Sequence, residues 1–143
     1  MKRKLTLLAS LAFLATANFA SAQAPTITAN DAKIQYTGRI DYTNPLQPKY
    51  TYPSVSIKAK FNGTGITATI HDYGTGAAGT TNYYKVFIDY VIVSEQLQML
   101  PGEHNYDLAT NLTAADHTVE IMKITEGAGS NNSSISNPFI LGI

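Results

Sequence analysis

Three histidines, His71, His104 and His117, are the side chains of this sequence that could act as a general base. Asp72 directly follows His71, and Asp116 directly precedes His117. In a hydrolase with a catalytic triad, a carboxylate orients such an imidazole, which then activates a nucleophile. Neighbouring residues of a β-strand point to opposite faces, so neither His–Asp pair is expected to form this contact. We therefore predict no catalytic residue in this chain.

The sequence also lacks the patterns of a nucleophile or a metal site. No serine lies in a Gly-x-Ser-x-Gly segment, and Ser130 falls in a polar run at 127–137 that predicts a loop. There is no cysteine, no His-x-His pair and no acidic loop with calcium-binding spacing. We expect no cofactor and no metal held by side chains, and a calcium ion held by backbone carbonyls stays an open alternative.

Tyrosine is the residue type that points toward a ligand, because its flat apolar face and polar hydroxyl suit stacking on a sugar. The sequence has nine tyrosines and no tryptophan. Tyr50, Tyr52 and Tyr73 lie in or beside predicted loops, and we predict them as sugar-binding residues, with ordinary sheet packing as the alternative. Packing is the expected role of three tyrosines inside predicted strands, which are Tyr36, Tyr84 and Tyr106.

Arg39 is the only arginine beyond the N-terminal leader, and it lies inside a strand pattern. A guanidinium group pairs with a carboxylate through two parallel hydrogen bonds. We predict that Arg39 is partly buried and anchored by Glu126 or Asp41, near an end of the fold where a following domain could dock. The alternative is a solvated arginine that lies over the sheet.

Alternating apolar residues predict the elements that position these side chains. The run His117–Gly127 has apolar residues on both faces, which predicts a central strand. The alternating segments 54–61 and 65–73 flank Asn-Gly-Thr-Gly, which predicts a hairpin. About eight short strands and no helical period are typical of a sandwich or barrel. We predict an all-β domain of two antiparallel sheets, with a core of Ile57, Phe61, Ile70, Val86, Ile88, Val119 and Ile121.

The N-terminus has the organisation of a bacterial Sec-type signal peptide. Basic residues at positions 2–4 precede an apolar run, and small residues at 20–22 fit a cleavage site. We expect a protein that is secreted or periplasmic. The predicted parts are a signal peptide at 1–22, a polar leader at 23–32 and a single folded domain at 33–143.

Composition limits the partners of the folded part. Beyond the signal peptide, seven basic residues stand against ten acidic ones, so nothing in the charge balance indicates nucleic-acid binding. The sequence also has no polybasic patch that would hold it to a membrane surface. We expect neither nucleic acid nor a membrane as a partner.

Five segments occur in an order that resembles the N-terminal domain of family 2 carbohydrate esterases. They are TGRID (37–41), KFNGTGITATI (60–70), YYKVFIDY (83–90), YDLATNLTAADHTVEIMKITEG (106–127) and a closing Phe-x-x-Gly-Ile. The resemblance covers nearly the whole chain after the leader, and TGRID and HTVEIMKITE are its specific parts. It implies a jelly-roll topology for the predicted β-sandwich.

The resemblance also implies a function. Members of this family are secreted deacetylases of plant polysaccharides such as acetylated xylan and glucomannan, and a C-terminal SGNH-type hydrolase domain carries their catalytic serine and histidine. No segment of this chain matches that domain. We therefore expect a non-catalytic accessory domain, with a plant cell-wall polysaccharide and an SGNH hydrolase domain as partners. The sequence stops within a strand pattern at 137–143, which agrees with a following domain. The alternative is a stand-alone secreted carbohydrate-binding module.

Overall fold

The structure is a computed structural model that describes residues 26–77 and 79–126, and the backbone of 133–142. The described residues form ten strands: β1 (Thr26–Ile27), β2 (Ile34–Thr37), β3 (Lys49–Tyr50), β4 (Ser56–Gly63), β5 (Gly65–Asp72), β6 (Tyr83–Ile88), β7 (Val91–Gln98), β8 (Gly102–Ala109), β9 (Ala115–Lys123) and β10 (Ser133–Gly142). The signal peptide predicted at 1–22 lies outside them. Within the described ranges, no helix is long and apolar enough to cross a membrane.

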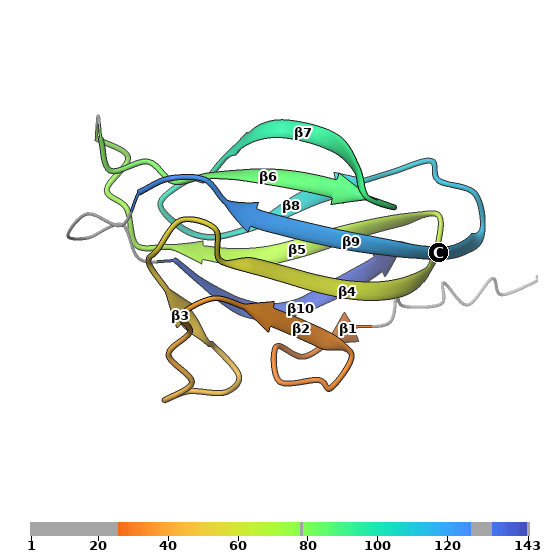
Figure 1. The fold of residues 1–143 in the computed structure, drawn as a ribbon, viewed down its shortest axis with the longest axis horizontal. Coiled ribbons are helices and arrows are strands. Elements are labelled where there is room, and N and C mark those ends of the chain that lie inside the picture. The colour runs from red at the N-terminus through yellow and green to blue at the C-terminus, as the bar shows by residue number, and fades with distance from the viewer. Residues whose placement is uncertain (1–25, 78, 127–132, 143) are drawn as a thin grey trace, which may run out of the picture.

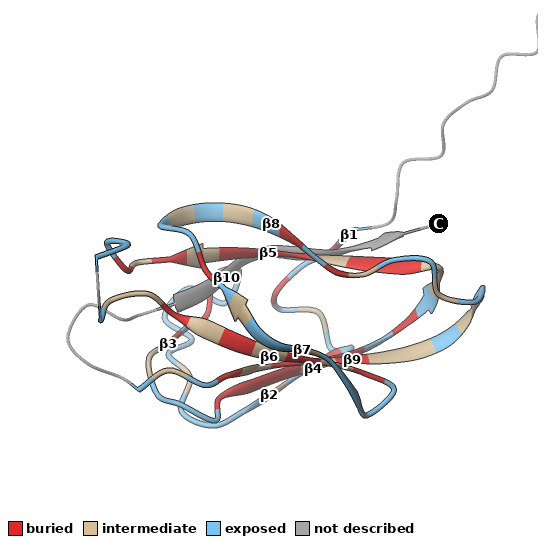
Figure 2. Cartoon of the chain, turned by 90° about the horizontal axis from the view of Figure 1, so that it is seen from above, coloured by how far each residue is buried: buried red, intermediate tan, exposed pale blue. Residues whose placement is uncertain are grey.

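The strands form two five-stranded antiparallel sheets, which lie face to face (Figure 1 and Figure 2). Sheet I has the order β2-β4-β9-β6-β7. Sheet II has the order β1-β10-β5-β8, and β3 pairs with β10 beside this path. The predicted all-β sandwich of two antiparallel sheets is therefore confirmed.

Apolar side chains from both sheets fill the space between them. All seven predicted core residues are buried, each with an exposed fraction of 5% or less. Burial of one such side chain stabilises the fold by about 1.5–3 kcal/mol. Tyr84 and Tyr106 are buried as well, and Tyr36 packs against the same core. The sheet-packing role predicted for these three tyrosines is confirmed.

Strand β9 occupies the centre of sheet I, as its two apolar faces predicted. It pairs with β4 on one side and with β6 on the other. Val119 and Ile121 face the core, whereas Thr118 and Glu120 face outward. This alternation places a row of polar side chains on the outer surface of sheet I.

The hairpin predicted across Asn62–Gly65 is wrong. Strand β4 pairs with β2 and β9 in sheet I, whereas β5 pairs with β10 and β8 in sheet II. The turn therefore carries the chain from one sheet to the other. Each strand keeps one apolar face toward the shared core, and this pattern is the same for two paired strands and for two strands of opposing sheets.

Two predicted boundaries also differ from the structure. The polar leader predicted at 23–32 includes β1, whose Ile27 lies in the core together with Ala29. The folded part therefore begins before residue 33. Strand β10 begins at Ser133, within the run at 127–137 that was predicted as a loop. Pairing with β5 and β3 supplies hydrogen bonds that override the weak strand propensity of its serines and asparagine.

Candidate functional site

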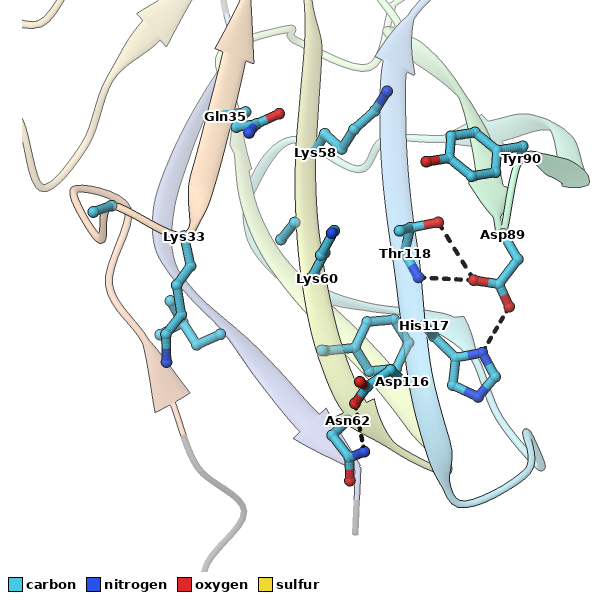
Figure 3. Close-up of a pocket in the computed structure, with 14 residues that line it drawn as sticks. Lys33, Gln35, Lys58, Lys60, Asn62, Asp89, Tyr90, Asp116, His117 and Thr118 are labelled. Carbon is cyan, nitrogen blue, oxygen red and sulfur yellow. Dashed lines mark hydrogen bonds and ion pairs between the residues drawn. The ribbon is translucent and has the colours of Figure 1, made fainter.

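A groove lies along the outer face of sheet I. It has a volume of about 1020 Å³. Its walls come from the start of β2, from β4 and β9, and from the turn between β6 and β7 (Figure 3). Its polar and aromatic lining residues are Lys33, Gln35, Lys58, Lys60, Phe61, Asn62, Asp89, Tyr90, Asp116, His117 and Thr118, and its aliphatic ones are Ile27, Ala32 and Ala59.

One wall of the groove is the two-residue turn Asp89–Tyr90, which joins β6 to β7. Both residues have positive φ, 49° and 66°, as in the type I′ turns that join hairpins. Asn and Gly usually fill these positions, and a tyrosine there costs roughly 1–2 kcal/mol. The Tyr90 side chain is 75% exposed, and its ring centre lies 5.7 Å from the Lys58 ammonium group.

Asp89 fixes this turn against β9. Its Oδ1 accepts hydrogen bonds from the backbone N–H and the hydroxyl of Thr118, at 2.8 and 3.3 Å. Its Oδ2 lies 2.7 Å from Nδ1 of His117. The hydrogen bond with His117, followed by the Thr118 amide, holds the pKa of Asp89 below its usual value. The carboxylate therefore stays ionised and keeps the turn in place beside the groove.

His117 has an acceptor at each ring nitrogen. Nδ1 faces Asp89, and Nε2 lies 2.9 Å from the carbonyl oxygen of Thr113. These two hydrogen bonds raise the pKa of His117, the Asp89 contact most strongly. A protonated ring that donates to two acceptors has no lone pair to offer a substrate. His117 thus joins two loops and is not arranged as a general base.

Two polar pairs join β4 and β9 on the outer face of sheet I, and Lys58, Asn62 and Asp116 of these pairs line the groove. Lys58 Nζ lies 2.9 Å from a carboxylate oxygen of Glu120. Asn62 donates a hydrogen bond from Nδ2 to Asp116 at 2.7 Å. These side chains repeat along the strands on one face, so they present donors and acceptors in rows about 4.8 Å apart. Such a surface suits a ligand with many hydroxyl groups.

The structure separates the three tyrosines that were predicted to bind sugar. Tyr50 is only 2% exposed, and its hydroxyl accepts a hydrogen bond from Tyr84 at 3.2 Å. Its ring is part of the core, so the prediction for Tyr50 is wrong. Tyr52 is 49% exposed, and Tyr73 is half-buried beside the His71 ring, 4.4 Å away. Neither residue lines the groove, and their predicted sugar contacts stay predictions.

Arg39 is exposed, and the predicted anchoring carboxylate is wrong. Gly38, with φ 109°, ends β2 and turns the chain before Arg39. The guanidinium group lies 5.5 Å from the ring centre of Tyr52, and its Nη1 is 3.4 Å from that hydroxyl. Among the described residues, no ion pair joins Arg39 to Glu126 or Asp41. A contact of Arg39 or Glu126 with another domain stays a prediction.

The remaining histidines also have local roles. His104 Nε2 lies 3.0 Å from the carbonyl oxygen of Pro101. His71 faces outward beside Tyr73, whereas the next residue, Asp72, is buried, so the two point apart as predicted. Across the ranges that the structure describes, no three His, Asp or Glu side chains gather closely enough to hold a metal ion.

A separate polar cluster lies inside the sandwich, at Asp72, Asn82, Lys123 and Thr125. Asn82 donates to Asp72 at 2.5 Å, and the Lys123 ammonium group donates to the Thr125 carbonyl at 2.9 Å. Lys123 is fully buried, and this burial lowers its pKa to about 8, although the charge of Asp72 acts in the opposite direction. Asp72, Asn82 and Lys123 are buried, so these three side chains are part of the core.

Sequence reasoning missed the residues that shape the groove, above all Tyr90, Lys33 and Lys60. Tyr90 was not considered as a ligand contact. A tyrosine in a two-residue turn, where Asn or Gly is usual, is a signal that could have identified it. The two lysines gave no such signal, because the groove that they line depends on the pairing of β2 with β4.

Comparison with known proteins gives the family and the fold. Residues 36–134 match the family described as Carbohydrate esterase 2 N-terminal. A family two carbohydrate esterase from Clostridium thermocellum, solved with cellohexaose, aligns with 76% of this chain and 31% of its own, at 22% identity and a TM-score of 0.67. A second one, from Cellvibrio japonicus, aligns with 84% of this chain and 34% of its own, at 22% identity and a TM-score of 0.66.

The sandwich also resembles a smaller module. A family 35 carbohydrate binding module from Clostridium thermocellum aligns over its whole length with 85% of this chain, at 14% identity and a TM-score of 0.57. No curated protein matches the sequence. The chain spans about a third of the length of the two esterases. Since the matched segment covers most of the sequence, the chain belongs to the carbohydrate esterase 2 N-terminal family.

Proposed function

We propose that this chain is a glycan-binding, non-catalytic accessory domain of a secreted carbohydrate esterase that deacetylates plant polysaccharides. The observation that carries the proposal is the groove of sheet I, with the exposed ring of Tyr90 on one wall and rows of polar side chains on its floor. Family membership supports the link to an esterase.

The groove has the parts that sugar recognition needs. An aromatic face stacks on the apolar face of a pyranose, and amide, hydroxyl and ammonium groups exchange hydrogen bonds with its hydroxyls. Tyr90 supplies the face, and Gln35, Asn62 and Thr118 supply polar groups on three adjacent strands. The backbone strain at Tyr90 supports a role in binding, because strained residues cluster at ligand contacts.

The chemistry of deacetylation belongs, in this proposal, to another part of the parent protein. Both ring nitrogens of His117 are occupied, and His104 is engaged with a carbonyl. Related esterases are about three times as long as the aligned region. The purified chain is therefore expected to release no acetate from p-nitrophenyl acetate above the buffer rate. Turnover that is lost on His117→Ala would contradict a non-catalytic role.

The cellular location follows from the N-terminal sequence. The basic, apolar and small-residue regions at 1–22 support export through the Sec pathway. In this proposal the mature chain reaches the periplasm or the medium, where an acetylated polysaccharide is accessible. Mass spectrometry of protein secreted by a bacterial host should give a mature N-terminus near residue 23. A retained, uncleaved chain would contradict this location.

Tyr90→Asn tests the binding role, because asparagine suits the positive φ of the turn and removes the ring. Affinity electrophoresis on xylan, glucomannan and cellulose should show that at least one polysaccharide retards the wild-type chain, and that Tyr90→Asn removes this retardation. The matched control is Tyr42→Asn, which removes a 53% exposed ring outside the groove and should leave retardation unchanged. If no polysaccharide retards the wild-type chain, the proposal fails.

A stand-alone binding module is the second candidate. It is favoured by the alignment over the full length of the family 35 carbohydrate binding module. In that case the same groove would bind the glycan without a linked hydrolase. Immunoblotting of the native secreted protein distinguishes the two candidates, because an esterase-linked domain would migrate at a mass well above 15.4 kDa.

A further inference from the structure

The carboxylate of Asp89 holds the turn that presents the Tyr90 ring to the groove. Asp89 and Tyr90 join β6 to β7, and both have positive φ, which is costly for residues other than glycine. The backbone N–H of Asp89 donates to the Thr118 carbonyl at 2.9 Å, and its carboxylate points toward the Thr118 amide and the His117 ring (Figure 3). The position of Tyr90 therefore depends on contacts between its neighbour and the start of β9.

His117 is enclosed beside this turn. Its side chain is only 9% exposed, and the centre of the Phe61 ring on β4 lies 5.5 Å from the centre of the imidazole. Nδ1 lies 2.7 Å from the Asp89 carboxylate, and Nε2 lies 2.9 Å from the Thr113 carbonyl oxygen in the loop before β9. The charged groups that act on the ring are Asp89 and Asp116, and both favour its protonated form.

A neutral imidazole cannot satisfy both acceptors. It carries a single N–H, so its other nitrogen presents a lone pair. If Nδ1 keeps the proton, the lone pair of Nε2 faces the Thr113 carbonyl, and if Nε2 keeps it, a lone pair faces the Asp89 carboxylate. Both arrangements are repulsive at these distances. Loss of the proton therefore displaces the ring, the loop or the turn, and it replaces an ion pair with a weaker contact.

We propose that His117 and Asp89 are positioning residues of the groove, which binds a glycan more tightly when His117 is protonated. This pH dependence rests on the proposed glycan-binding function and deepens it. The imidazolium holds Asp89, so that the turn presents Tyr90 in one orientation. After deprotonation the turn loosens, and the ligand has to order the Tyr90 side chain on binding, which weakens association.

Isothermal titration calorimetry from about pH 5.5 to about pH 8.5 tests the pH dependence. The probes are xylohexaose, mannohexaose and cellohexaose, which are uncharged throughout this range. Hydrogen bonds to Asp89 and Thr113 raise the pKa of His117, so the affinity should be highest at the acidic end and should fall above about pH 6.5. We expect a decrease of about three- to fivefold, which corresponds to the ordering of one side chain. An affinity that rises with pH would overturn the proposal.

Two variants assign the effect to this pair. His117→Gln cannot be protonated, so its affinity should not change with pH and should equal that of the wild type near pH 8.5. Asp89→Asn suits the positive φ of the turn and removes the charge, so it should also abolish the pH dependence. If one of these variants unfolds, the other decides. A pH dependence that survives in either folded variant would overturn the proposal.

The matched control changes the two histidines outside the groove. His71→Gln combined with His104→Gln leaves His117 as the only histidine of the chain, and it should retain the full pH dependence. Loss of the dependence in this control would overturn the proposal. Lys123, whose pKa is lowered to about 8, lies at the other end of β9 and is still present in His117→Gln. Its titration therefore cannot explain a difference between that variant and the wild type.

An NMR titration separates positioning from a general effect on stability. The Tyr90 amide and the His117 ring should titrate with the same midpoint, because one event moves both. Saturating oligosaccharide should raise the pKa of His117 further, since the coupling between proton and ligand is reciprocal. An unchanged pKa of His117 at saturating ligand would overturn the proposal.

The remaining outcomes distinguish this proposal from the function on which it rests. If at least one oligosaccharide binds with the same affinity at all pH values, glycan binding stands and the positioning role is overturned. If none of the three binds at any pH, the glycan-binding function fails and the pH dependence fails with it.

Discussion

The interior cluster and the groove are built from the same residue types, and they differ in what those residues can still do. Both contain an asparagine amide that donates to an aspartate, which is Asn82 to Asp72 inside and Asn62 to Asp116 in the groove. Inside the sandwich, the carboxylate is 2% exposed and the nearby Lys123 is fully buried. In the groove, the corresponding lysine, Lys60, is exposed, and its ammonium group forms no ion pair with the described residues.

This contrast separates the residues that stabilise the domain from the residues that can bind a ligand. Water cannot reach buried polar groups, so they depend on hydrogen bonds with protein atoms. The loss of one such hydrogen bond strongly lowers the free energy of unfolding. Exposed polar groups contribute little to folding and can exchange water for a ligand. The interior cluster should therefore control unfolding, and the groove should control binding.

The largest contrast is expected between two aspartates. Asp72→Ala leaves the Asn82 amide and the buried Lys123 ammonium without their carboxylate, and should lower the free energy of unfolding by about 3–5 kcal/mol. Asp116→Ala removes the equivalent hydrogen bond on the surface and should change it by less than about 1 kcal/mol. Urea unfolding of both variants measures this. Similar losses of unfolding free energy in the two variants would contradict the claim that the interior cluster controls stability and the groove does not.

Alkaline pH provides the second test of the interior cluster. Burial lowers the pKa of Lys123 to about 8, whereas an unfolded lysine titrates near 10.4. Between these values the unfolded chain binds a proton that the folded chain lacks, so the free energy of unfolding rises with pH. We expect a gain on the order of 2 kcal/mol from about pH 8 to about pH 10 in urea unfolding.

The control for this prediction is Lys123→Met, which should remove the gain. The tyrosines do not interfere in this window. Burial raises the pKa of Tyr36 and Tyr50, so their stabilising effect is present below about pH 10 and is lost only above it. A gain of the same size in Lys123→Met would contradict the assignment to the buried ammonium group.

A smaller pH effect is expected at the groove. Hydrogen bonds to Asp89 and Thr113 raise the pKa of His117. The stabilisation is therefore complete below the unfolded value of about 6.5 and is lost as the pH rises through the folded value. Asp89 is half exposed, so solvent weakens the effect. An NMR titration of the His117 ring should give a pKa above about 6.5, and a lower value would exclude a protonated link between the two loops.

The smallest effect is expected at Arg39. Its guanidinium group is exposed and stacks on Tyr52, so Arg39→Ala should change the free energy of unfolding by no more than about 0.5 kcal/mol. Urea midpoints of the variant and the wild type measure this. A loss of about 2 kcal/mol or more would show that a carboxylate anchors Arg39 after all.

The sequence was informative wherever one face of a strand had to be buried. Alternation in β9 predicted a central strand and placed Val119 and Ile121 in the core, because the side-chain period of a strand decides which face is apolar. The same alternation could not tell whether β4 and β5 pair or face each other across the core. The hairpin prediction failed at this point.

The site was harder to predict, because it depends on register. Gln35 and Lys58 of the groove are distant in sequence, and only the β2–β4 pairing brings them together. Tyr50 was predicted as a loop residue. It lies instead in β3, which pairs with β10, and the Tyr50 ring is buried in the core. Lys123 shows the same limit, since its alternation pattern placed it on the apolar face and gave no indication of what would satisfy its charge.

The central claim is that glycans bind in the groove of sheet I, and an NMR titration tests it most directly. The ligand is xylohexaose, added to the ¹⁵N-labelled mature chain. Amide shifts should change at Gln35, Lys60, Tyr90 and Thr118, with little change at Tyr52 or Tyr73. Changes centred on Tyr52 and Tyr73, or no changes at millimolar ligand, would contradict the account.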